Sequence, residues 1–180
     1  MHLKVITEPM EEPLGVEVVK SYLRLDHSEE DTLLKSMITV AREQAENFTR
    51  RSIASKTYEL TLEEFQNKIK IPNPPLQTME SITVKDKSGT VTNVTNYMFS
   101  ESEPAILHVE WPEVELYPVD AIKIRYTSGY DTVPKSLEQA MLLHVSHLYE
   151  NREIVIVGTS AVKMPFSVES LLLPYKVGWF

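Results

Sequence analysis

The sequence contains no cysteine. This absence excludes disulfide bonds, thiolate catalysis and zinc sites built on sulfur. The chain also lacks a run of about 18 consecutive apolar residues, so no transmembrane helix is predicted. Its opening stretch, MHLKVITEPMEEP, has no apolar segment of the length that a signal peptide needs. We therefore expect a protein that is made and retained in the cytosol.

Glycine-rich motifs are missing as well, since the chain has only five glycines. No GxGxxG or phosphate-binding loop is present, and no strand–helix alternation accompanies one, which disfavours a nucleotide-binding α/β fold. No serine lies in a GxSxG nucleophile elbow. The residues by themselves therefore indicate no recognisable active site and no cofactor.

The composition is that of a soluble globular protein. The chain has 180 residues, of which 42% are hydrophobic and 24% charged, and one domain is the default at this length. Acidic residues outnumber basic ones by 26 to 18, which gives a net charge of -8. This charge opposes general adhesion to nucleic acid or anionic lipid, yet it suits a surface past which DNA slides without binding.

Helical periodicity occurs in three parts of the chain. The first helix is expected at about 14–25, with Leu14, Val18, Tyr22 and Leu25 on one face. The second is expected at about 29–51, and Ser28 followed by Asp31 resembles a capping box at its start. Its expected apolar stripe is Leu33, Leu34, Met37, Ile38, Ala41, Ala45 and Phe48. A third is expected at about 135–151, directly after Pro134.

The period changes to two between residues 56 and 127, which predicts an antiparallel β unit with one solvated face. Turn-forming segments such as PNPP and DKSGT separate its strands. The expected strands are 56–62, 68–71, 81–84, 106–110 and 121–127. The chain is thus predicted to be α+β, with a helical hairpin and a C-terminal helix packed together and the β unit inserted between them.

The boundary of the domain is expected at about residue 153. Residues 1–153 would form a single α+β domain, and residues 154–180 a C-terminal arm. Ser167 is expected to cap a short helix that ends at Pro174. The arm is strongly apolar for a chain terminus, so it is expected to dock on its own domain or on a partner. We predict partner contacts at the following residues: Leu171, Leu172, Leu173, Tyr175, Trp179 and Phe180.

The third helix carries His144, His147 and Glu150 at three-residue spacing. Each such step rotates a helical side chain by about 60°, so the three fan out instead of converging on a metal. His144 follows the apolar stripe of the helix and is expected in the core. The i, i+4 pair found in HExxH metal sites is missing. We therefore expect no metal, although a metal-dependent enzyme using His144 and His147 remains an alternative.

Several segments, taken in order, resemble the head–tail connector (adaptor) proteins of tailed phages and prophages. They are EPLGVEVVKSYLRLDHSEEDTLLKSMITVAREQAENFTRRSI, YELTLEEF, IPNPPLQTMESITVKD, YMF, IRYTSGYDTVPKSLEQAMLLHVSHLYENRE and LLLPYKV. The resemblance covers nearly the whole chain, and the order and spacing of the segments are more specific than any one of them. The glycine usual in that family after Thr49 is Arg50 here.

This resemblance implies a structural protein of the virion head–tail junction, assembled in the host bacterial cytoplasm, and not an enzyme. Such adaptors form a ring of about 12 subunits beneath the portal, closed by heterologous contacts. The ring extends the DNA channel and joins head to tail. The implied partners are other copies of the chain, the portal, a stopper or tail-completion protein, and duplex DNA that passes without specific binding. A DNA-packaging accessory protein is a further alternative.

Overall fold

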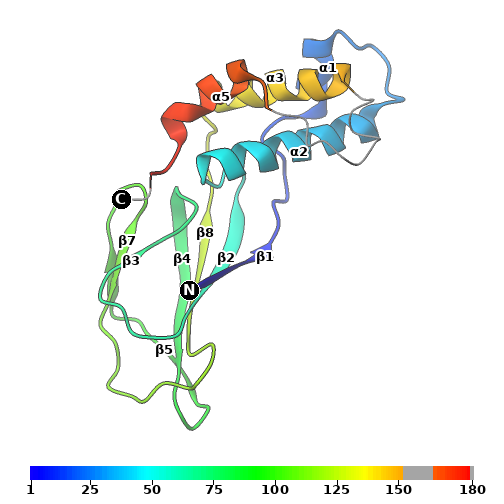
Figure 1. Cartoon of the computed structure of the whole chain (residues 1–180). Coiled ribbons are helices and arrows are strands. Elements are labelled where there is room, and N and C mark those ends of the chain that lie inside the picture. Colours follow the sequence, from blue (N-terminus) through cyan, green and yellow to red (C-terminus); the bar gives the residue numbers. More distant parts are fainter. Residues whose placement is uncertain (152–163, 179–180) are drawn as a thin grey trace. The chain divides into compact units, whose positions relative to one another are not determined.

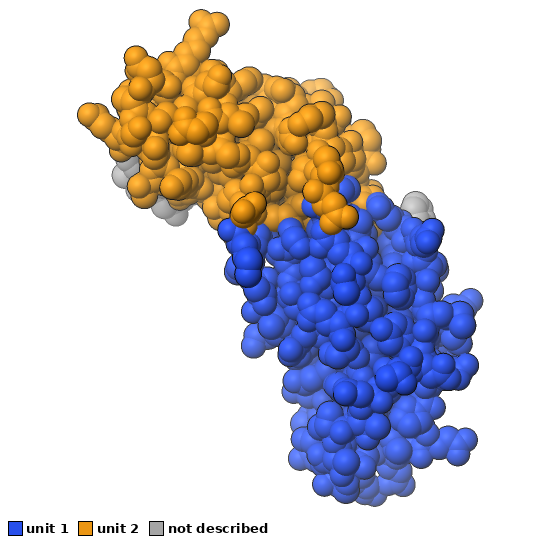
Figure 2. Space-filling model, turned by 180° about the vertical axis from the view of Figure 1, so that it is seen from behind, with its two compact units in different colours: residues 1–10, 55–130 blue, residues 11–54, 131–180 orange. Residues whose placement is uncertain are grey.

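The computed structural model describes residues 1–151 and 164–178 of the chain. The chain divides into two compact units (Figure 2). The β unit comprises residues 1–10 and 55–130, and the helical unit comprises residues 11–54 and 131–180. The β unit is inserted in the sequence between helices that pack together, so the predicted α+β fold class is confirmed.

The helical unit is built on α2 (Asp31–Thr49) and α3 (Lys135–Glu150), which pack against each other (Figure 1). Helix α1 (Val16–Leu23) contacts both, and α5 (Phe166–Leu172) packs on α3 and α2. A 3₁₀ helix, η1 (Leu173–Tyr175), follows α5 directly. The core is apolar and comprises Leu14, Val19, Leu34, Met37, Ile38, Ala41, Ala45, Leu137, Ala140, Met141, Val145, Leu148, Val168 and Leu172.

The predicted apolar face of α1 is wrong. Val18 and Tyr22 are 52% and 42% exposed, whereas Val19 and Lys20 are buried. The reason is that Lys20 buries its aliphatic stem while its Nζ pairs with Asp31 Oδ1 at 3.1 Å. A periodicity based on hydrophobicity treats that lysine as solvent-facing and shifts the face by one position.

Both predicted serine caps are also wrong. The N-cap of α2 is Glu30 and that of α5 is Pro165, and neither makes a side-chain capping hydrogen bond. Ser28 Oγ instead accepts a hydrogen bond from Lys20 Nζ at 3.2 Å, which removes it from the end of α2.

Two helices end at an arginine in the left-handed conformation. Arg24 follows α1 with φ 58°, and Arg50 follows α2 with φ 57°. Backbone N–H groups at these helix ends bond back to the last turn. The N–H of Leu25, the residue after Arg24, donates to Lys20 O at 2.9 Å, and the N–H of Arg50 donates to Glu46 O at 2.7 Å. The left-handed turn after Thr49 therefore forms without glycine.

Replacing Arg24 with glycine is expected to raise the free energy of unfolding by about 0.5–1 kcal/mol, because glycine adopts this conformation without a Cβ clash. Chemical denaturation measures the change. The matched control is Lys35→Gly at an exposed site inside α2, where the substitution costs about 1 kcal/mol. Equal losses at both positions would contradict the expectation.

The β unit holds two antiparallel sheets. The five-stranded sheet has the order β1-β2-β8-β4-β5, and the three-stranded sheet has the order β3-β7-β6. The strands are β1 (His2–Thr7), β2 (Lys56–Leu62), β3 (Ile69–Lys70), β4 (Leu76–Lys85), β5 (Val91–Asn93), β6 (Tyr97–Phe99), β7 (Ile106–Val109) and β8 (Ile122–Ser128).

Alternation along these strands separates a core from a charged face, as predicted. Buried residues of both sheets form one cluster, within which the Tyr58 and Tyr126 rings stack with centroids 5.6 Å apart. On the other face of the five-stranded sheet, Glu59 pairs with Arg125 at 2.8 Å and with Lys123 at 3.1 Å. No helix within residues 1–151 and 164–178 is long and apolar enough to cross a membrane.

Candidate functional site

The side chains of His144, His147 and Glu150 lie in different environments on α3. His144 is buried at 1% exposure, Glu150 is exposed, and His147 lies half-buried between these extremes. His147 Nδ1 lies 3.2 Å from the side-chain amide nitrogen of Asn151. In the described part of the chain, no group of three or more His, Cys, Asp or Glu side chains is placed to hold a metal ion. His144 in the core confirms the position that the apolar stripe predicts.

His144 has an unusual environment for a titratable group. Neither ring nitrogen has a hydrogen-bond partner among the described residues. Burial, and secondarily the neighbouring His147, lower the pKa of His144 to about 4. The imidazole is therefore neutral near pH 7 and acts there as a core side chain.

A buried charge cluster, which the sequence patterns do not reveal, lies in the helical unit. Arg42 is 2% exposed; its Nε donates to Glu12 Oε2 at 2.7 Å and its Nη1 donates to Glu46 Oε2 at 2.8 Å. Glu46 Oε1 also accepts the backbone N–H of Ile53 at 2.8 Å. The cluster ties the segment before α1 and the segment after α2 to the same helix, so its role is to hold the unit together.

The C-terminal segment is attached to the end of α2. Arg51 Nε donates to the carbonyl of Tyr175 at 2.5 Å, and the N–H of Val177 donates to the carbonyl of Thr49 at 2.9 Å. Lys176 Nζ lies 4.8 Å from the centroid of the Phe48 ring. These bonds supply partners for the C-terminal end of α2, so this part of the predicted arm docks on its own unit.

The six predicted contact residues differ in accessibility. Leu172 is 0% exposed and belongs to the core, whereas Leu173 is 60% exposed; Leu171 and Tyr175 lie between these extremes. Trp179 and Phe180 lie outside the described residues. Phe166, seven residues before Leu173 on the same side of the helix, is 84% exposed. The apolar surface that α5 and η1 present is thus Phe166 and Leu173.

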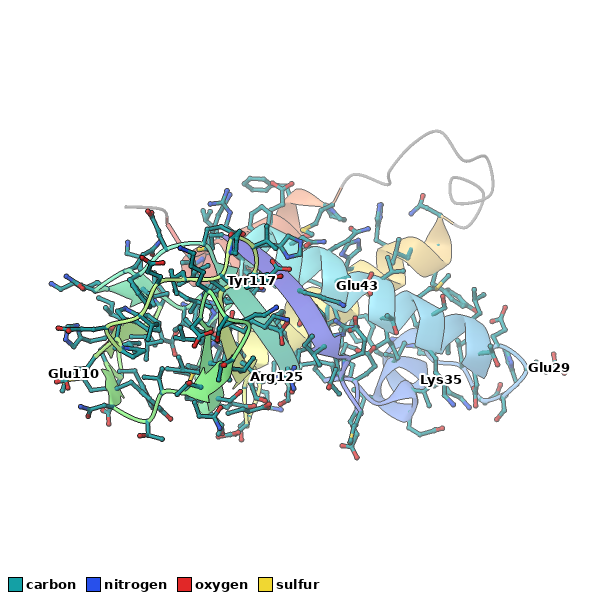
Figure 3. The ribbon with its side chains drawn as sticks, turned by 90° about the horizontal axis from the view of Figure 1, so that it is seen from below. Glu29, Lys35, Glu43, Glu110, Tyr117 and Arg125 are labelled. Atoms are coloured by element: carbon teal, nitrogen blue, oxygen red, sulfur yellow. The ribbon has the colours of Figure 1, made fainter. Side chains whose placement is uncertain are left out.

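The β unit carries a strongly acidic segment. Residues 88–122 include no lysine or arginine. The acidic residues in this segment are all exposed and are Glu101, Glu103, Glu110, Glu113, Glu115 and Asp120. Figure 3 shows Glu110 at the periphery of the β unit with its side chain pointing outward. Lys87 pairs with Glu115 at 2.7 Å, and the remaining acidic groups of the segment repel polyanions and favour basic partners.

Comparison with known proteins gives one family and a shared fold. The sequence profile of the head completion protein family matches residues 14–176. A search of curated proteins gives no match. Among solved structures, a chain in the neck of an empty gene transfer agent (GTA) particle, computed with C6 symmetry, gives a TM-score of 0.81 at 22% identity. That alignment covers 100% of this chain and 97% of the other.

Two further structures give the same result. A chain in the virion of the native GTA particle aligns with a TM-score of 0.80 at 22% identity. A chain in the native GTA neck computed with C12 symmetry aligns with a TM-score of 0.79 at 21% identity. Each alignment again covers 100% of this chain and 97% of the other. At these identities the likeness establishes the fold.

The family match runs from Leu14 to Lys176, so it includes the helices and every strand except β1. It confirms the resemblance to phage connectors and the expectation of a structural protein of phage-like particles instead of an enzyme. The chain therefore belongs to the head completion protein family.

Proposed function

We propose that this protein is a ring-forming adaptor at the head–tail junction of a tailed phage or prophage particle. About 12 copies would assemble beneath the portal, extend the DNA channel and bind a stopper or tail-completion protein. Assembly would take place in the host bacterial cytoplasm. The observation that carries this proposal is the family match over residues 14–176.

The shared fold supports the proposal. Chains from GTA necks computed with C6 and C12 symmetry share this fold over 97% of their length. A chain that repeats around an axis needs heterologous contacts, in which different surfaces of neighbouring copies meet. The exposed apolar residues on both units, including Val18, Phe99 and Leu173, supply candidate surfaces for such contacts.

The charge distribution supports passage of DNA without binding. The chain has a net charge of -8, and residues 88–122 present acidic groups with no lysine or arginine among them. Phosphate contacts by lysine and arginine dominate nonspecific affinity for DNA, so such a surface leaves DNA free to slide. This charge also disfavours the alternative of a DNA-binding packaging accessory protein.

Electron microscopy of the protein mixed with the portal encoded near it tests the proposal. We expect an added ring of density beneath the portal, whose symmetry gives the number of subunits. Folded protein in excess that adds no density would contradict the adaptor role. A salt-dependent shift of labelled duplex DNA would instead support the packaging accessory alternative.

The C-terminal contacts have a separate test. Replacing Leu173 with serine, or ending the chain after Gly178 to remove Trp179 and Phe180, is expected to weaken portal attachment by about tenfold or more. Both changes leave Val168 and Leu172 in the core, so the unit stays folded. Val119→Ser, at a residue 61% exposed in the β unit, is the matched control. Sedimentation with the portal measures attachment, and equal binding by all variants would refute these contacts.

A further inference from the structure

Strand β6 forms one edge of the three-stranded sheet. It is the last strand of its sheet and pairs only with β7, through Tyr97–Val109, Met98–His108 and Phe99–Leu107. The N–H of Glu110 bonds to Asn96 O at 3.0 Å, and the N–H of Ser100 bonds to Ile106 O at 2.9 Å.

Because backbone groups alternate in direction along an antiparallel strand, those of Tyr97 and Phe99 point away from β7. They offer two N–H and two C=O groups to an added strand. Met98 and Phe99 are 66% and 45% exposed beside them. The strand contains no lysine, proline or bulge, which are devices that block pairing at a sheet edge.

Strand β1 has the second open edge. It pairs with β2 on one side only and ends the five-stranded sheet. Val5 and Ile6 are 36% and 38% exposed, and Lys4 is exposed between Leu3 and Val5. The register with β2 shifts between Val5 and Thr7, so the regular part of this edge is His2–Val5. Residues 1–7 contain a lysine and a histidine but no acidic residue. This edge is therefore apolar and basic.

The charges of the two edges are complementary. Strands β6 and β7 lie within the acidic segment 88–122, with Glu101 two residues after β6 and Glu110 directly after β7. The remaining edge of the five-stranded sheet, β5, also lies within residues 88–122, but Lys85 and Lys87 precede it and no acidic residue lies between Asp86 and Glu101, so it does not offer β1 the same attraction. Complementary charge favours the pairing of β1 with β6 over its pairing with β5.

We propose that β1 of one copy adds to the open edge of β6 in the next copy, and that this contact closes the ring. The inference rests on the proposed ring. Within the β unit, β1 and the three-stranded sheet lie at opposite sides (Figure 1). Two different, complementary edges on opposite sides of one unit make a heterologous contact that repeats from copy to copy. Strand addition of this kind takes its affinity from backbone hydrogen bonds and its specificity from side chains beside them.

Because the chain has no cysteine, engineered thiols report this contact without background. The variant with Ile6→Cys and Met98→Cys is assembled with the portal and treated with a short bis-maleimide. We expect covalent ladders of two, three and more copies on a denaturing gel. The matched control is Ile6→Cys with Val91→Cys, since Val91 is 60% exposed on the three-residue edge strand β5. Ladders from the control but not from the test pair would overturn the proposal.

A charge placed at the same edge gives a second test. Met98→Lys is expected to reduce ring assembly by about tenfold or more, whereas Val91→Lys leaves it unchanged. Both substitutions are at exposed positions, and circular dichroism checks that both variants fold. Rings formed equally by Met98→Lys would overturn the β1–β6 contact and leave the adaptor proposal intact. Failure of the wild-type protein to form rings with the portal would overturn both.

Discussion

Replacing Arg42 with alanine is expected to lower the free energy of unfolding by about 3–5 kcal/mol, the largest effect of any single substitution proposed for this protein. The guanidinium is almost fully buried and bonds to both Glu12 and Glu46. Burial by itself opposes the charge, but the hydrogen bond to Glu12 and the charges of both carboxylates raise the pKa of Arg42 above its ordinary value. Removing it leaves two carboxylates without their cation, one of them in the core.

The control for Arg42 is an ion pair of the same length on the surface. Lys87 Nζ lies 2.7 Å from Glu115 Oε2, and both side chains are about three-quarters exposed. Lys87→Ala is expected to cost no more than about 1 kcal/mol, since solvent screens the pair and its side chains are mobile. Urea denaturation of both variants at pH 7 measures the difference. Similar losses would show that the Arg42 cluster contributes no more than a surface pair.

The burial of Arg42 could not be predicted from the sequence, although the apolar core of the same helix could. The stripe of α2 correctly placed Leu34, Met37 and Ile38 in the core. It did not predict that Arg42 is buried. Hydrophobic periodicity counts every arginine as solvent-facing, and the carboxylates that pair with Arg42 are 4 and 30 residues away in the sequence. The apolar face of α1 was predicted wrongly for the same reason, because Lys20 is buried. Buried charges become visible only when distant segments have been placed.

The strands show a related limit. Strand β2 was predicted at its observed bounds, and β8 within one residue, because alternation over seven residues is a strong signal. Strands β5 and β6 have three residues each, too few to show a period, and β1 pairs with β2 across more than 50 residues of chain. The missed strands β1, β5 and β6 are all at sheet edges. Two of these edges, β1 and β6, are the surfaces on which ring assembly is proposed to depend.

The second large effect is a pH dependence that His144 confers on folding. Its pKa is about 4 in the folded protein, against an ordinary value of 6.5 for the unfolded chain. Between these values the unfolded state binds a proton that the folded state does not, so the free energy of unfolding falls as the pH falls. From pH 7 to pH 5 this group alone is expected to remove about 2 kcal/mol, and the contribution is complete near pH 4.

Substituting methionine for His144 isolates this effect, because the side chain is similar in size and suits a helix interior. At pH 7 the variant is also expected to be more stable by about 1 kcal/mol or more, since two buried nitrogens without partners are removed. Its advantage over the wild type should then grow by about 2 kcal/mol between pH 7 and pH 5. The contribution of the carboxylates to the pH dependence is the same in both proteins, so it cancels in the difference between their free energies of unfolding. A stability difference between wild type and His144→Met that stays constant over this range would mean that His144 binds its proton equally well in the folded and unfolded states, so that burial does not lower its pKa.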